Sequence, residues 1–334
     1  MKPTIKTTVV GSYPVPDWLA NCPSEQALKD ATTVVFKIQE NAGIDLIADG
    51  ELYRFDINHP ETNGMIDYFV RPLGNCRSAI SRSDEDAFRR DHAMDFRVRP
   101  AGVVEGPLNE GTLNLPHDYQ RARALTRSPL KFTVTGPHML SKTLLDLHYK
   151  SREALCNALA EIIASQVATI DADVLQVDEA NITGHADESD WALRAMNIVL
   201  SAVKKKAAVH MCFGNYGGQS IQKGTWAKLV RYLSGLKADH VLVELAYRGE
   251  KELKFLADVD KKVGFGIGVI DIKSTVIESP EEVARRIEVA VKALGANRVT
   301  YVNPDCGFWM LKRNIADGKM RALVKGRDLF EGRK

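Results

Sequence analysis

Four side chains of the types that bind zinc are spread along the second half of this chain. His210 and Cys212 are separated by one residue, so on a strand they would point to the same side. Glu244 and Cys306 occur at the ends of two later apolar runs. One nitrogen, one oxygen and two sulfurs suit tetrahedral zinc, whereas magnesium and calcium prefer oxygen ligands alone. A His-x-Cys pair alone is more often structural, but the four positions together predict a metal site.

The elements that would position these side chains follow a regular alternation. Eight short apolar runs, most of them separated by helix-patterned segments, predict parallel strands covered by helices. The runs are Ile5–Val10, Leu46–Ala48, Phe132–Thr135, Val174–Val177, Ala207–Met211, Val241–Leu245, Val263–Val269 and Arg298–Val302. The helical segments include Ser24–Asn41, Arg152–Thr169, Ser189–Lys204, Thr225–Leu233, Glu250–Leu256, Pro280–Leu294 and Ile315–Val324. Eight such units favour an α/β fold of the (β/α)8 TIM-barrel type. An open doubly wound sheet stays as the alternative, because periodicity does not show closure.

Polar residues mark the predicted carboxyl ends of these strands. In a (β/α)8 barrel the reactive side chains project from that end. The polar ends are Gly11-Ser12, Asp49-Gly50-Glu51, Thr135-Gly136-Pro137-His138, Asp178-Glu179, His210-Met211-Cys212, Glu244, Asp271-Ile272-Lys273 and Asn303-Pro304-Asp305-Cys306. A ring of ionisable groups around one mouth is costly unless it binds a ligand, so we expect the active site there.

Two segments depart from the alternation. Residues 52–130 follow the second predicted strand, and within them Ser81–Arg90 is strongly charged while Phe96–Leu115 is interrupted by glycine and proline. We expect an insertion, partly helical and partly a hairpin, that lies over the barrel mouth; a surface excursion or a dimer contact is the alternative. The Gly-rich segment Phe213–Ser220 indicates either a loop whose backbone approaches a ligand or a simple turn.

The composition is that of an ordinary globular protein. The 334 residues are 45% apolar and 26% charged with a net charge of +2, which favours neither nucleic acid nor an anionic membrane as partner. No apolar run has membrane-spanning length, and the first residues contain no signal-peptide core. Five widely spaced cysteines argue against a secreted disulfide framework. We therefore expect a single catalytic domain over residues 1–334 in the cytoplasm, with a homo-oligomer left open.

These motifs resemble those of a known family. The chain is similar to the C-terminal catalytic domain of cobalamin-independent methionine synthase, within a wider group that includes uroporphyrinogen decarboxylase-like barrels. The matching motifs are Val10-Gly11-Ser12-Tyr13-Pro14, Asp49-Gly50-Glu51, Thr135-Gly136-Pro137, Val177-Asp178-Glu179, His210-Met211-Cys212, Val243-Glu244 and Val302-Asn303-Pro304-Asp305-Cys306-Gly307. They span nearly the whole chain in the family's order.

The resemblance implies a set of residue roles. It implies a Zn²⁺ site whose ligands are His210, Cys212, Glu244 and Cys306. It further implies that Gly11 and Ser12 hold the carboxylate of an amino-acid substrate, while Glu51 and Asp178 take its ammonium group. Ionised carboxylates accept hydrogen bonds only, which suits that role. A free thiol is a poor nucleophile at neutral pH, and binding to zinc removes its proton.

The chain departs from the family pattern in three ways. The full-length enzyme has two barrels, and only the catalytic one is present, which leaves the methyl donor open. The family's tryptophan after Thr-Gly-Pro, which can stack on a pterin, is matched by Thr143. The family's histidine in Asp-Ile-His is matched by Lys273, whose ordinary pKa of about 10.4 suits proton donation to a leaving group poorly. Lys273 is a candidate acid, a contact for an anionic substrate group, or a side chain that extends out of the barrel mouth.

The resemblance implies a zinc-dependent S-methyltransferase with a small-molecule thiol as one substrate. Homocysteine would receive a methyl group from a methyl-folate or a methyl-corrinoid donor to give methionine. The first alternative keeps the site and changes the substrates, as in the epoxyalkane–coenzyme M transferases, where a thiol is alkylated by an epoxide. The alternatives of other classes are a metal-free lyase of the uroporphyrinogen decarboxylase type and a zinc- or thiol-binding module without catalysis.

Overall fold

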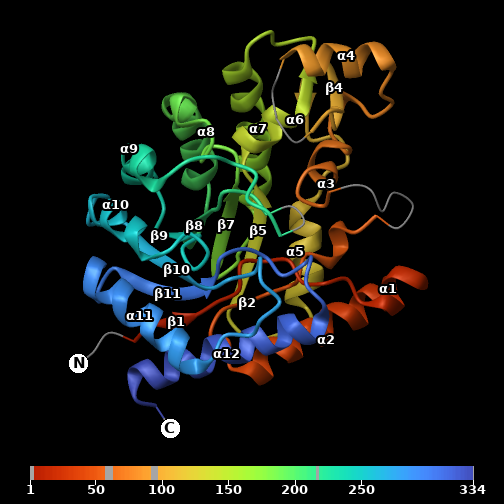
Figure 1. Ribbon diagram of the computed structural model, residues 1–334. Helices are drawn as coiled ribbons and strands as arrows, with labels where there is room; N and C mark the ends of the chain where they lie inside the picture. The colour runs from red at the N-terminus through yellow and green to blue at the C-terminus, as the bar shows by residue number, and fades with distance from the viewer. Residues whose placement is uncertain (1–3, 57–62, 92–96, 216–217, 334) are drawn as a thin grey trace.

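The computed structural model describes residues 4–56, 63–91, 97–215 and 218–333 (Figure 1). Its centre is a curled sheet of eight parallel strands in the order β1-β11-β10-β9-β8-β7-β5-β2. These strands are β1 (Lys6–Thr7), β2 (Ile47–Ala48), β5 (Leu130–Thr135), β7 (Val174–Glu179), β8 (Lys206–Met211), β9 (His240–Val243), β10 (Gly264–Ile270) and β11 (Val299–Pro304). Parallel bridges between Thr8 and Leu46 and between Ser12 and Gly50 join the two ends of this order. The predicted (β/α)8 fold class is confirmed, and each predicted strand overlaps an observed one.

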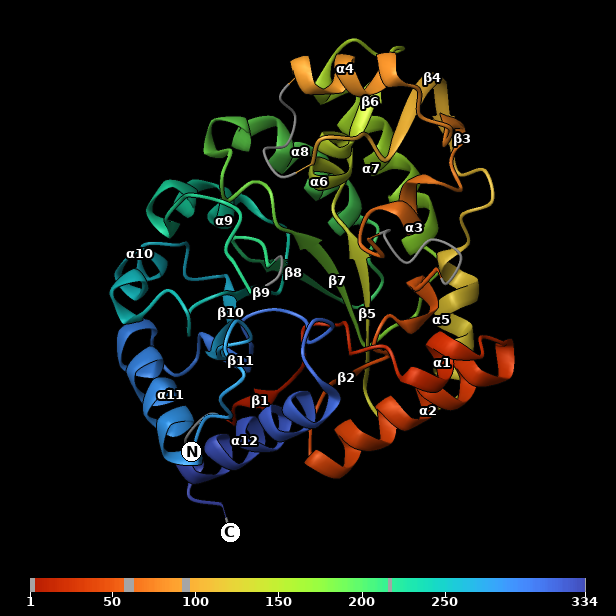
Figure 2. The same cartoon turned by 45° about the vertical axis from the view of Figure 1, so that its right-hand side comes forward.

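Helices cover the outside of the sheet, as Figures 1 and 2 show for α7 to α12 and α2. The helices are α1 (Asp17–Asn21), α2 (Glu25–Ala42), α6 (Pro137–Thr143), α7 (Arg152–Val167), α8 (Ser189–Ser201), α9 (Val230–Gly235), α10 (Leu253–Ala257), α11 (Pro280–Leu294) and α12 (Arg313–Glu331). Short 3₁₀ turns are η1 (Leu52–Arg54), η2 (Ala186–Glu188), η3 (Trp226–Leu229) and η4 (Glu250–Glu252). Among the described residues, no helix is long and apolar enough to cross a membrane.

Local signals explain where the long helices begin and end. The hydroxyl of Ser279 accepts a hydrogen bond from the Glu282 amide at the start of α11, and Pro280 occupies its first turn. Ser24 caps α2 in the same way, and Gly43 ends that helix with a φ of 86°. Only glycine adopts such a positive φ without strain.

The interior of the barrel contains a small apolar cluster as well as buried polar side chains. Val174, Ala208 and Leu242 belong to a small buried cluster between the strands. Because side chains alternate along a strand, Asp178, His210 and Glu244 point to the same side as these residues, nearer the carboxyl ends. The sheet therefore brings the predicted site residues together at the carboxyl ends of its strands.

The insertion after β2 contains more regular structure than the sequence indicated. It holds α3 (Asp67–Val70), β3 (Gly74–Arg77), α4 (Arg82–Asp91), β4 (Gly102–Asn109) and α5 (Leu115–Arg123). β3 and β4 are antiparallel, and β4 also pairs in parallel with β6 (Leu144–Asp146), which follows α6. Figures 1 and 2 show this small sheet and α4 beyond α6, on the opposite side of the barrel from the chain ends.

Candidate active site and metal centre

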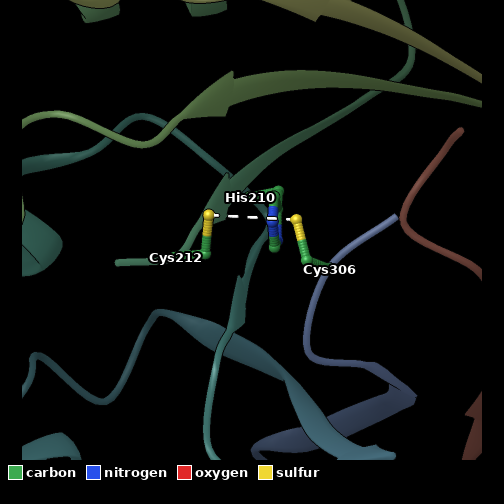
Figure 3. A group of neighbouring side chains, drawn as sticks. All are labelled: His210, Cys212 and Cys306. Carbon is green, nitrogen blue, oxygen red and sulfur yellow. Dashed lines mark hydrogen bonds between the residues drawn. The ribbon is translucent and has the colours of Figure 1, made fainter. Parts of the chain in front are cut away.

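Three potential metal ligands meet at the carboxyl end of the barrel. His210 lies near the end of β8, Cys212 directly follows that strand, and Cys306 lies two residues beyond β11. One ligand atom from each side chain lies within 4.8 Å of the others, and the two sulfurs are 4.0 Å apart. Figure 3 shows the sulfurs facing one another with the imidazole beside them. Residues nearly a hundred positions apart in the chain therefore form one cluster.

The surroundings of this cluster fit a metal ion. His210 is only 3% exposed, and neither of its ring nitrogens has a hydrogen-bond partner among the described residues. A buried polar group without a partner is costly, and a metal would remove that cost. Imidazole nitrogen with two sulfurs is a donor set typical of zinc.

The two cysteines differ in acidity because they interact. The hydrogen bond between the sulfurs lowers the pKa of Cys306 well below its usual range, and the neighbouring His210 adds to this effect. The same interaction, together with burial, raises the pKa of Cys212. Cys306 is therefore the side chain that more readily provides a thiolate.

Glu244, expected as the fourth ligand, lies near this cluster but has other partners. It directly follows β9, and its Oε1 forms an ion pair with Nζ of Lys273 at 2.9 Å. Its Oε2 accepts a hydrogen bond from the amide of Phe213 at 2.8 Å. Lys273 has a side chain that is 2% exposed, so it does not extend from the barrel mouth. The structure thus gathers three of the four expected ligands and pairs the fourth with Lys273.

A cavity of about 210 Å³ opens onto the three potential ligands. Its lining includes Ser12, Glu51 and Asp178, three of the residues expected to bind an amino acid. Gly11 lies directly behind, since a Cβ built there would stand 2.1 Å from Oε1 of Glu51. The other part of the lining is mainly apolar and includes Val15, Phe55, Met65, Met139, Ile221 and Trp309.

The two carboxylates of the cavity are held differently. Glu51 has a φ of 58°, accepts a hydrogen bond from the Thr133 hydroxyl at 2.6 Å and pairs with Arg54 at 3.1 Å. Oδ1 of Asp178 accepts a hydrogen bond from the side-chain Nε2 of Gln176 at 2.6 Å. Burial and the nearby Glu51 raise the pKa of Asp178 to about 7. Burial of a second negative charge beside the first thus favours a cationic ligand between them.

The sequence patterns missed two buried basic residues, one in the cavity lining and one inside the barrel. Arg54 is buried and also donates to the carbonyl oxygen of Thr133 at 2.5 Å; its spacing of three residues from Glu51 was the available signal. Lys131 is fully buried in β5, where it donates to Gln176 at 2.8 Å and to the carbonyl oxygen of Val9. Burial lowers the pKa of Lys131 to about 7. The predicted apolar run began only at Phe132, so nothing in the sequence indicated that Lys131 is part of this strand.

A pair of amides forms a further polar feature of the cavity. Nε2 of Gln222 donates to Oδ1 of Asn181 at 2.8 Å, which fixes the orientation of the Asn181 amide. Nδ2 of Asn181 is then buried without a described partner, in a residue that is 1% exposed and lines the cavity. Such a group can donate to an acceptor atom of a bound substrate.

The Gly-rich segment after β8 contributes to the cavity through Gly214 and Asn215. Gly214 has a φ of 75°, which turns the chain back so that Ile221 pairs with Phe213. Tyr216 and Gly217 lie outside the described residues. Thr143, at the family's tryptophan position, is fully buried in α6 and is not part of the cavity lining.

Comparisons with known proteins agree with this architecture. The family model described as the catalytic domain of cobalamin-independent synthase matches residues 5–327. The methionine synthase of Sulfurisphaera tokodaii is 28% identical, over 97% of this chain and 92% of its own length. That of Thermococcus kodakarensis is 29% identical, over 97% of this chain and 93% of its own length.

Two solved structures share the fold. The B12-independent methionine synthase from Shewanella sp. W3-18-1, solved in complex with selenomethionine, has a TM-score of 0.81 and 24% identity over 98% of both chains. The vitamin-B12-independent methionine synthase, described as putative, from Listeria monocytogenes has a TM-score of 0.70 and 15% identity, again over 98% of both chains. Because the family model covers nearly the whole chain, the chain belongs to the family of cobalamin-independent synthase catalytic domains.

Proposed function

We propose that this chain is a zinc-dependent S-methyltransferase that methylates homocysteine to methionine. The observation that carries the proposal is the cluster of His210, Cys212 and Cys306 at the end of a cavity that also contains Glu51 and Asp178. The family membership and the relatives named methionine synthase support the same reaction class.

The amino-acid part of homocysteine would bind between the first two strands and β7. Its ammonium group would lie between Glu51 and Asp178, where an added positive charge favours the ionised form of both carboxylates. Its carboxylate would accept hydrogen bonds from the Ser12 hydroxyl and the backbone beside Gly11. The tight contact of Gly11 with Glu51 supports this arrangement, since a side chain there would displace the carboxylate.

The sulfur of homocysteine would then point toward His210, Cys212 and Cys306. Zinc held by these residues would act as a Lewis acid that favours loss of the thiol proton. In the transfer, a sulfur–carbon bond forms while the bond between the methyl group and its donor breaks. With a methyl-folate donor, the leaving nitrogen would take up one proton, which balances the proton lost by the thiol. With a methyl-corrinoid donor, the bonding electron pair would stay on cobalt as cobalt(I), and the thiol proton would pass to solvent.

The apolar part of the cavity would receive the methyl donor. Met65, Met139 and Trp309 lie there, and Trp309 is 41% exposed, so its ring is accessible from solvent. The donor is a methyl-folate or a methyl-corrinoid, and the experiment below distinguishes them. We also propose that the chain is one catalytic barrel whose insertion, residues 52–130, covers the mouth. The insertion residues that line the cavity support this: Leu52, Arg54, Phe55, Asp56, Asn63, Gly64 and Met65.

Methionine formation from homocysteine tests the proposal. The purified protein, loaded with zinc, would be given homocysteine with either 5-methyltetrahydrofolate or methylcobalamin, and methionine would be measured by mass spectrometry. We expect methionine with one of the two donors. Thiol consumption with an epoxide but with neither methyl donor would replace the proposal by thiol alkylation, and full activity after complete zinc removal would contradict both.

Cys306→Ser isolates the role of the cluster. The exchange removes one sulfur ligand, so we expect loss of zinc and of methionine formation while the far-ultraviolet circular dichroism is unchanged. Cys22→Ser is the matched control, because Cys22 is an exposed free cysteine that does not line the cavity, and it should keep both zinc and activity. Retained zinc and full activity in Cys306→Ser would refute the ligand assignment.

A further inference from the structure

We propose that Lys273 keeps Glu244 out of the metal's ligand set. The resting centre would then be made by His210, Cys212 and Cys306 alone, with its fourth position open to the incoming sulfur. This inference rests on the metal site of the proposed function, and it goes further by assigning a positioning role to Lys273.

Both oxygens of Glu244 have partners among the described residues. Oε1 lies 2.9 Å from Nζ of Lys273, and Oε2 lies 2.8 Å from the amide nitrogen of Phe213. The Glu244 side chain has no solvent exposure, so water does not compete for these contacts. To bind the metal, Glu244 would have to leave at least one of these partners.

The backbone on both sides of Glu244 is also held in place. The amide of Glu244 donates to the carbonyl oxygen of Met211 at 3.2 Å. Asp305 accepts hydrogen bonds from the amides of Leu245, Ala246 and Tyr247 at 2.8 to 2.9 Å. The loop after β9 is therefore fixed to the strands that carry Cys212 and Cys306, and the carboxylate has little freedom to turn.

Lys273 is equally constrained. Its side chain is 2% exposed, and its Nζ lies 4.8 Å from the centre of the Tyr247 ring. Its own amide donates to Asp271, whose amide in turn donates to Glu278. Separating one partner of a buried ion pair leaves an uncompensated charge, which is strongly unfavourable. Lys273 therefore gives Glu244 a partner that a metal would have to displace.

The position of the cavity agrees with an open fourth site. His210, Cys212 and Cys306 line the cavity, whereas neither Glu244 nor Lys273 does. A sulfur that enters through the cavity approaches the three ligands from the side where Glu244 is absent. Two thiolates also neutralise a divalent zinc ion, so the three-ligand set needs no further anion, while Lys273 neutralises Glu244 separately.

Binding of Co²⁺, whose visible absorption reports its ligands, tests this inference. The metal-free protein would be titrated with Co²⁺ as wild type, as Lys273→Met and as the double variant Lys273→Met with Glu244→Gln. The double variant removes both charges together and leaves an oxygen for the Phe213 amide. Lys142→Met is the matched control, because Lys142 is another buried lysine that pairs with a glutamate, the half-buried Glu188, outside the cavity lining.

We expect the double variant and the control to keep the wild-type Co²⁺ spectrum and a dissociation constant within about threefold of wild type. Lys273→Met alone should bind Co²⁺ about tenfold or more tightly with an altered spectrum, because the released carboxylate becomes a ligand. If the double variant bound Co²⁺ tenfold or more weakly than the wild type, Glu244 would already be a ligand of the metal. That result would overturn the inference without affecting the proposed reaction. Absence of stoichiometric metal binding in the wild type would overturn both.

Discussion

Asp49 illustrates how a buried acid beside the cavity determines the response to pH. It is 3% exposed, its Oδ1 accepts a hydrogen bond from the Glu51 amide at 2.9 Å, and its Oδ2 has no described partner. Burial raises the pKa of Asp49 from 3.8 to about 7, although Arg54 opposes the shift. The native state therefore holds a proton on Asp49 over a range in which the unfolded chain has lost it.

We predict that Asp49→Asn changes how stability depends on pH. Because the folded pKa is raised, the contribution of Asp49 to stability is complete below about pH 4 and is lost as the pH rises through about 7. A shift of about three pKa units corresponds to at most about 4 kcal/mol. The variant should match the wild type in free energy of unfolding near pH 4 and exceed it at pH 8, as urea unfolding would measure.

The control for this prediction is an exposed acid. Asp190→Asn, on the surface at the start of α8, should leave the pH profile of stability as it is in the wild type. Parallel profiles for the wild type and Asp49→Asn between pH 4 and pH 8 would contradict the raised pKa.

At the scale of elements, the loop between β10 and α11 determines where Lys273 lies. Glu278 in this loop accepts from the Asp271 amide and pairs at 2.9 Å with Lys319, a fully buried lysine of α12. Nζ of Lys319 also donates to the carbonyl oxygen of Val276 at 2.5 Å. A helix on the outside of the barrel thus anchors the loop that carries Lys273, the partner of Glu244.

Removal of this anchor should weaken the fold. Lys319→Met leaves Glu278 with the more distant Arg286, at 3.7 Å, as its one ionic partner among the described residues. We predict a loss of about 3 kcal/mol in the free energy of unfolding, the lower end of the range for breaking a buried ion pair. Adding Glu278→Gln to Lys319→Met should recover part of the loss, since no uncompensated charge then remains. A double variant less stable than the single one would contradict this explanation.

The elements differ in how far the sequence could predict them. The eight barrel strands were recognisable because strands buried on both faces form continuous apolar runs, and α11 because Ser279 and Pro280 mark its start. The small sheet of β3, β4 and β6 was not recognisable from the sequence, because its pairing joins segments on either side of β5 and depends on tertiary contacts. The segment Gly102–Asn109 contains glycine and proline, yet it forms the strand β4, because tertiary pairing determines its conformation.

The candidate site was also only partly predictable from the sequence. The pattern His210-x-Cys212 with Cys306 was sufficient to predict the cluster, because strand ends in a barrel converge. It could not predict that Lys273 takes the carboxylate of Glu244, or that Gln222 orients Asn181, since both pairs join different loops. Residue types give the chemistry that is available, whereas the partners of each group depend on the folded loops.

At the scale of the whole molecule, the barrel closes where the beginning and the end of the described chain meet. Arg327 near the end of α12 is buried, donates to the carbonyl oxygen of Ile5 at 2.9 Å and pairs with Asp45 at 2.5 Å. Asp45 in turn accepts from the amide and the hydroxyl of Thr7 in β1 at 2.7 and 2.9 Å. Since β1 and β2 are both short and are joined only through flanking bridges, this group of contacts strengthens the seam of the barrel.

We predict that Arg327→Met destabilises this seam more than the rest of the barrel. Loss of the buried guanidinium leaves Asp45 and the Ile5 carbonyl without one partner each, at a cost of about 2 to 3 kcal/mol. For a chain of this length that corresponds to a fall in Tm of roughly 3 to 4 °C. Hydrogen exchange should become faster first for amides in β1 and β2, because the seam opens before β7 and β8 are affected. Arg194→Met is the control, because the Arg194 side chain is 61% exposed and its surface pair with Glu153 contributes little. Equal changes in the two variants, or exchange that becomes faster to the same extent in β7 and β8, would show that the seam is not the weak point of the barrel.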